Sequence, residues 1–98
     1  MIATYPKLDR ALARAEKRGI TAVKPATGKE PGPFVILATR YYYGGDEVTA
    51  PLYDEGGRNP EIFASYEEAK GRVQEMDEAI HYLAHGECAR PLFTIVSL

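Results

Sequence analysis

Residues 65–83, SYEEAKGRVQEMDEAIHYL, decide the fold that this sequence can adopt. Their apolar side chains recur at steps of three and four residues, which places them on one face of an α-helix and requires a core beneath that face. These side chains are Tyr66, Ala69, Val73, Met76, Ile80 and Leu83. Ser65 and Glu68 fit a capping box, in which each side chain bonds a free backbone N–H of the first turn. Gly71 costs the helix about 1 kcal/mol relative to alanine, and we interpret it as a point of close approach to a neighbouring element.

Three segments with strand character surround this helix. Residues 34–43, FVILATRYYY, and residues 91–98, PLFTIVSL, are the most apolar of them, and one of the two is expected to be the central strand. Residues 46–53 form the returning strand of a hairpin, because Gly44-Gly45 suits the positive φ values of a tight turn. Pro51 cannot donate to a ladder, so this strand is expected at an edge of the sheet.

A second helix is predicted at Pro6–Arg18. Proline fits the first helical position, and Gly19 can end the helix in a left-handed conformation. The apolar stripe consists of Leu8, Ala11, Leu12 and Ala15. The outer face carries Arg10, Arg14 and Arg18 at four-residue spacing.

The expected element order is α-β-β-(β)-α-β, in a single domain spanning residues 1–98. A chain of this length has room for one core and no second domain. We expect an α+β fold, a small, mainly antiparallel sheet of three to four strands with two helices on one face. The other face would then expose apolar residues that a twin could cover in a homodimer.

Composition indicates an ordered globular chain, with 45% apolar and 27% charged residues. The single cysteine, Cys88, excludes an internal disulfide and favours a reducing compartment. The first residues lack the apolar stretch of a signal peptide, and no apolar run approaches the ~20 residues of a membrane span. We therefore expect a cytoplasmic protein that does not enter the membrane.

Charge is unevenly distributed along the chain. Residues 1–30 hold seven basic and three acidic side chains, a net charge of +4, and the remainder holds five basic and eleven acidic ones, a net charge of −6. Two helices with complementary solvated faces would explain this pattern. The other interpretation is a pair of contact faces, a basic one on the first helix and an acidic one on the second. The acidic candidates are Glu67, Glu68, Glu75 and Glu78.

Tyrosines form a further group of candidate contact residues. Tyr41, Tyr42 and Tyr43 close one strand of the hairpin and Tyr53 closes its partner, so we expect the rings to gather at one end of the hairpin. Tyrosine is enriched in protein interfaces, and rings on a sheet can stack nucleic-acid bases. Cross-strand pairing that only stabilises the hairpin is the alternative.

No catalytic motif is recognisable in the sequence. His81, His85 and Cys88 are the best candidate metal ligands, because histidines at i and i+4 share a helix face and a thiolate follows the helix. The simpler interpretation is that His85 interacts with the helix dipole and Cys88 is a small buried hydrophobe. Thr27-Gly28-Lys29 resembles part of a phosphate loop but lacks its first glycine. We expect no cofactor and no enzymatic activity, with a small metal-dependent enzyme as an alternative.

Two stretches carry a family resemblance. Residues 82–87, YLAHGE, running to Arg90-Pro91, and residues 63–69, FASYEEA, resemble small orphan proteins encoded by phages and prophages. Some such proteins, anti-CRISPR proteins among them, inhibit host defence by occupying a surface of the effector complex. The resemblance implies a mobile-element inhibitor with a host defence complex as its partner. It implies no particular functional residue.

The leading hypothesis is therefore a non-enzymatic protein-interaction module. Its contact surface would include the hairpin tyrosines and one charged helix face. The alternative is a nucleic-acid-binding or regulatory protein that uses the first helix, where arginines could contact phosphates. The acidic pI of about 5.7 argues against this alternative.

Overall fold

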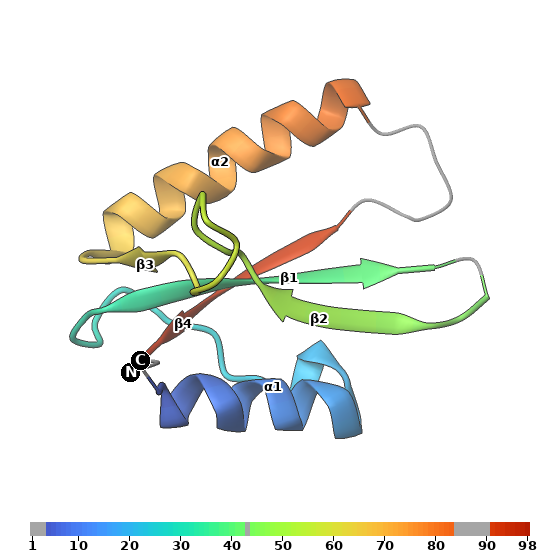
Figure 1. The fold of residues 1–98 in the computed structure, drawn as a ribbon, viewed down its shortest axis with the longest axis horizontal. Helices are drawn as coiled ribbons and strands as arrows, with labels where there is room; N and C mark the ends of the chain where they lie inside the picture. The colour runs from blue at the N-terminus through green and yellow to red at the C-terminus, as the bar shows by residue number, and fades with distance from the viewer. Residues whose placement is uncertain (1–3, 43, 84–90) are drawn as a thin grey trace.

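The computed structural model describes residues 4–42, 44–83 and 91–98. Its elements run in the order α-β-β-β-α-β, which confirms the predicted α+β fold (Figure 1). They are α1 (Pro6–Arg18), the short 3₁₀ turn η1 (Ile20–Ala22), β1 (Phe34–Tyr41), β2 (Glu47–Pro51), β3 (Ile62–Phe63), α2 (Tyr66–Leu83) and β4 (Leu92–Ser97). The four strands form one antiparallel sheet.

Strand β1 is the centre of the sheet. Strand β4 pairs with one side of it along residues 34–39. The other side is shared, because β2 pairs with residues 37–41 and β3 with residues 34–35. The predictions that residues 34–43 or 91–98 supply the central strand, and that Pro51 lies in an edge strand, are both confirmed.

Strands β2 and β3 belong to one interrupted edge. Leu52 donates its N–H to the carbonyl of Ile36 at 3.0 Å, and Glu61 then donates to the carbonyl of Leu52 at 2.7 Å. Between them, residues 53–60 leave the sheet as a small side hairpin, which Asp54 closes by donating its N–H to Asn59 at 2.9 Å. This excursion lies on the side of the sheet that faces α2 (Figure 1).

The two helices cover opposite faces of the sheet, so the prediction that both lie on one face is wrong (Figure 1). Val35 and Leu37 pack with the apolar stripe of α1, whereas Phe34 and Ile36 pack with α2. Successive side chains of a strand point to opposite faces, and all four of these are buried. A strand that is covered on both faces has a continuous run of apolar residues in its sequence, and residues 34–37, FVIL, are such a run. The open sheet face that suggested a homodimer therefore does not exist.

Local signals at the ends of the elements are largely confirmed. Helix α1 ends at Arg18, and Gly19 has a positive φ of 82°, although its ψ of 170° is extended rather than left-handed helical. The hairpin turns through Gly45, whose φ is 91°. At the start of α2, Glu68 donates its N–H to Ser65 Oγ at 3.2 Å. The Glu68 carboxylate in turn accepts a hydrogen bond from the N–H of Ala64 at 3.3 Å, whereas in a capping box it would accept one from the N–H of Ser65.

Candidate interaction surfaces

The outer side of α1 carries a shallow depression with a volume of about 510 Å³. Its lining consists of Arg10, Ala13, Arg14, Lys17, Arg18 and Ala22. The four cations are all exposed, and we call them the basic face. In the described part of the chain both ion pairs involve Arg72 of α2, so none of the four cations is neutralised by a neighbouring carboxylate.

The packing of α1 explains why the basic face points outward. Leu8, Ala11 and Ala15 are buried against the sheet, and an amphipathic helix must present its opposite side to solvent. Four-residue spacing separates successive arginines by about 6 Å along the helix axis. Because Ala13 and Ala22 have only methyl side chains, the space between the longer cationic side chains stays hollow.

The η1 side of this depression is joined to the sheet. Glu47, the first residue of β2, accepts a hydrogen bond from the N–H of Ile20 at 2.8 Å. The side chain of Ile20 is buried in the α1-side core. Both contacts hold η1, and with it Ala22, against the sheet. The carboxylate of Glu47 is thus engaged within the molecule.

The acidic face of α2 lies on the other side of the sheet. Glu67, Glu68, Glu75 and Glu78 are exposed, as the sequence predicted. Two of the four also have partners within the chain, because Glu75 lies 3.2 Å from Arg72 Nη1 and Glu68 accepts the N–H of Ala64. Arg72 Nε lies 3.4 Å from Oε1 of Glu61, the residue before β3, which links α2 to the start of that strand. Part of the acidic face is therefore engaged within the chain, whereas among the described residues no carboxylate pairs with the basic face.

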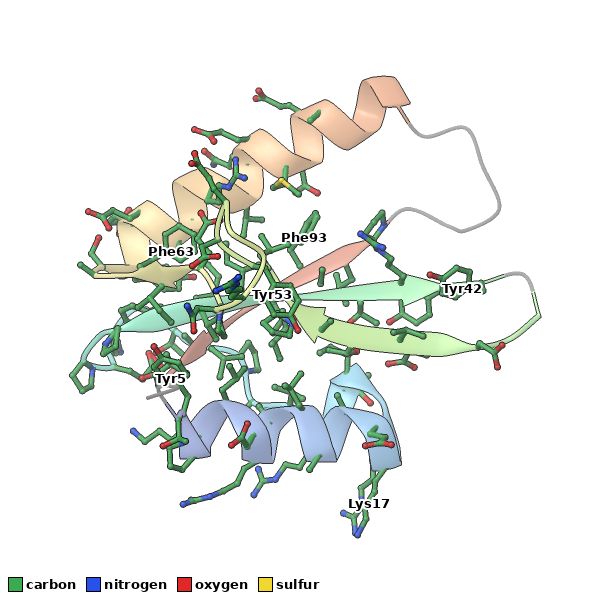
Figure 2. The ribbon with its side chains drawn as sticks, in the orientation of Figure 1. Tyr5, Lys17, Tyr42, Tyr53, Phe63 and Phe93 are labelled. Carbon is green, nitrogen blue, oxygen red and sulfur yellow. The ribbon has the colours of Figure 1, made fainter. Side chains whose placement is uncertain are left out.

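The tyrosines do not form one cluster. Tyr41 lies opposite Glu47 at the turn end of the hairpin, whereas Leu37 lies opposite Pro51 at the far end. Tyr53 follows Pro51 and therefore lies far from Tyr42, as Figure 2 shows. Tyr42 is 40% exposed and Tyr53 51% exposed, while Tyr41 packs on the α1-side core. The prediction that Tyr53 joins the other rings is wrong. In a hairpin the end of the first strand, where Tyr41 lies, is next to the start of the second strand, whereas Tyr53 follows the end of the second strand.

Some predicted site residues lie outside the described part of the chain. Tyr43, His85 and Cys88 are among them, and the side chain of His81 is likewise not described. Within the described residues, no group of three or more His, Cys, Asp or Glu side chains could hold a metal ion. No described helix is long and apolar enough to cross a membrane.

Residues 27–30 form a closed local hydrogen-bond cluster. The Glu30 carboxylate accepts the backbone N–H groups of Thr27, Gly28 and Lys29 at 2.8, 3.1 and 3.1 Å. The Thr27 hydroxyl donates to the same carboxylate at 3.0 Å. Backbone hydrogen bonds, that from Thr27 above all, lower the pKa of Glu30 from 4.5 to about 2. The loop that resembles part of a phosphate loop thus directs its donors at its own carboxylate.

Comparisons with protein-family models, curated proteins and solved structures find no match. Function is therefore inferred from the geometry of the chain itself. The sequence indicated the arginine row of the basic face through its four-residue spacing. It did not indicate that Ala13 and Ala22 line the same depression, because Ala22 reaches that position only through the η1 turn.

Proposed function

We propose that this protein is a non-enzymatic interaction module that binds an acidic surface of a partner protein through the basic face of α1. One observation carries the proposal. Four exposed cations and two alanines line one depression, and within the described residues none of the four cations has an ionic partner. The acidic face of α2 supports it less well, because part of its charge is already engaged.

The arrangement suits protein recognition for physical reasons. Protein interfaces commonly have an apolar centre and a polar rim, and arginine is enriched among the residues that contribute most to binding. Here the two alanines leave room for a side chain of the partner, and the cations around them can pair with its carboxylates. Complementary charge would also accelerate association and select the partner.

The resemblance to phage and prophage proteins supplies a concrete version of this proposal. In that version the protein is encoded by a mobile element, acts in the host cytoplasm, and occupies an acidic patch of a defence complex. The partner would lose access to the surface that the basic face covers.

Affinity capture from nuclease-treated lysate of the producing cells tests the proposal with three baits. They are the wild type, the triple variant Arg10→Ala, Arg14→Ala, Arg18→Ala, and a matched α2 control, Glu67→Gln, Glu75→Gln, Glu78→Gln. We expect a stoichiometric protein that the wild type and the α2 control retain and that the α1 variant loses. Retention by the α1 variant, or the absence of any such protein, would contradict the proposal.

Nucleic-acid binding is the second candidate, and the same four cations, which have no carboxylate partner among the described residues, favour it. Against it, the exposed rings of Tyr42 and Tyr53 lie apart and offer no common stacking platform beside α1. A mobility shift with single- and double-stranded oligonucleotides distinguishes the two candidates. A shift that the triple alanine variant abolishes would favour nucleic acid over an acidic protein.

A further inference from the structure

The depression on α1 follows one side of that helix. Side chains three and four residues apart share a side of a helix, and five of the described lining residues are related in this way: Arg10, Ala13, Arg14, Lys17 and Arg18. From first to last they span about 12 Å of the helix axis. Ala22 of η1 lies beside this row. An occupant therefore meets a straight row of side chains about two helical turns long.

The surroundings of the depression limit the conformation of its occupant. An extended peptide that adds to a sheet needs a free strand edge, and a polyproline segment needs a groove lined by aromatic rings. The described lining residues are basic or alanine, and all belong to α1 or η1. The sheet lies on the opposite side of α1 (Figure 1). An α-helix satisfies its own backbone groups and can bind through side chains alone, so it suits this surface best.

The spacing of the arginines agrees with a helical occupant. Arg10, Arg14 and Arg18 follow one another at about 6 Å along α1, and carboxylates four residues apart on a second helix repeat at the same distance. When two helices cross at about 20°, such rows stay close over two turns. Each guanidinium can then donate two hydrogen bonds to one carboxylate. An extended segment repeats at about 7 Å, so the lack of a strand edge here, and not the spacing, argues against it.

The alanines of the depression favour close approach of a second helix. Ala13 is exposed and Ala22 is half-buried. The distance between packed helices depends on the side chains at the contact, and methyl groups permit a short one. The occupant is therefore expected to carry a small or apolar side chain between its carboxylates.

We propose that the basic face of α1 binds an acidic amphipathic α-helix of the partner protein, with carboxylates at four-residue intervals along one side. The inference rests on the proposed function and names the element that the basic face recognises. The two helices would pack side by side, with the row of carboxylates against the row of arginines.

The α2 helix of a second copy matches this description less well. Glu67 and Glu75 have the same separation as the first and last arginines of the row. Gly71, midway between them, would leave the central arginine, Arg14, without a carboxylate. Glu75 also lies 3.2 Å from Arg72 Nη1 of its own helix. A helix of a different protein is therefore the expected occupant.

Three synthetic peptides, titrated into the full chain and followed by fluorescence anisotropy, test the shape of the occupant. The first carries three glutamates at four-residue intervals in a background of alanine and glutamine, which favours a helix. The second has the same composition with the glutamates at alternate positions, so that they share a face only in an extended conformation. The third is the first peptide with a central proline, which breaks the helix.

We expect the first peptide to bind about tenfold or more tightly than either of the others, and its helix content to rise on binding, as circular dichroism would show. Arg14→Ala should weaken its binding severalfold. Lys24→Ala provides the matched control, because Lys24 is an exposed cation outside the described lining of the depression, and its affinity should remain that of the wild type.

Two results would overturn the helical occupant while binding through the basic face stands. One is equal affinity for the first and second peptides, since acidity alone would then suffice. The other is failure of the first peptide to bind although a partner captured from lysate binds through the arginines. If no partner is captured and no peptide binds, the proposed function fails and this inference fails with it.

Sedimentation of the free protein at increasing concentration tests the remaining occupant. We expect no self-association that depends on the basic face. A dimer or larger assembly that Arg14→Glu and Glu67→Gln both abolish would assign the basic face to α2 of a second copy, and the proposal would be overturned.

Discussion

Glu47 Oε1 accepts a hydrogen bond from the backbone N–H of Ile20, with 2.8 Å between the two atoms. The bond joins the first residue of the edge strand β2 to the turn that follows α1. It gives Glu47 a structural role. Because Ala22 belongs to the same turn, the bond also helps to position one of the residues that line the depression on α1.

Replacing Glu47 with alanine should lower the free energy of unfolding by about 1 kcal/mol, because the N–H of Ile20 loses its acceptor. Glu47→Gln should have a smaller effect, since the amide oxygen can still accept the bond. Urea unfolding of both variants measures the difference. Equal stability of the alanine and glutamine variants would show that the bond contributes nothing.

Gly71→Ala should stabilise the protein by about 1 kcal/mol, because alanine has the higher helix propensity. The sequence suggested that Gly71 marks a close approach, but no described atom lies within 4 Å of the position that a Cβ would occupy. The expectation of a close approach is therefore wrong. Thermal unfolding measures the gain, and a lower melting temperature in the variant would contradict the observed open space.

Gly32→Ala should have the opposite effect. A Cβ at Gly32 would lie 2.5 Å from the backbone carbonyl oxygen of Ala64, and a backbone atom cannot move aside as a flexible side chain can. We expect a loss of about 1–3 kcal/mol, as for other overpacked positions. Urea unfolding beside Gly71→Ala provides the comparison, and an unchanged midpoint would show that the two segments separate at little cost.

Glu30 should contribute a pH-dependent component to stability. Its pKa is lowered in the folded protein from 4.5 to about 2, so the folded state favours the ionised carboxylate. The contribution is fully present above about pH 4.5 and disappears as the pH falls toward 2. Glu30→Gln should lack this component. Unfolding curves of both proteins between these pH values measure it, and parallel pH dependences would contradict the role of the cluster at residues 27–30.

Part of the fold was predictable because local signals and tertiary packing agree. The stripe of α1, the glycine turn and the proline of β2 each carry a signal that the structure confirms. The placement of the helices was not predicted, because the order of elements does not specify which face of a sheet each helix covers. The run Phe34–Leu37 contained the missing information, since all four side chains are buried on alternate faces.

The candidate surfaces were predictable to different degrees. Helical periodicity was sufficient to place Arg10, Arg14 and Arg18 together. The contact between Ala26 and the edge of β4 depends on pairing directions and on the path of residues 25–26, neither of which is encoded in a short motif. The separation of Tyr53 from Tyr42 depends on the strand register, which the spacing of tyrosines does not reveal.

Binding of an acidic partner through the basic face of α1 is tested most directly by the dissociation constant of the captured complex for Arg14→Glu, measured by titration calorimetry. Arg14 lies between Arg10 and Arg18 on the exposed side of α1, so reversing its charge should leave the fold intact. We predict binding weakened by about tenfold or more, with little change for the matched α2 variant Glu75→Lys. An unchanged dissociation constant for Arg14→Glu, or a loss confined to Glu75→Lys, would contradict binding through the basic face.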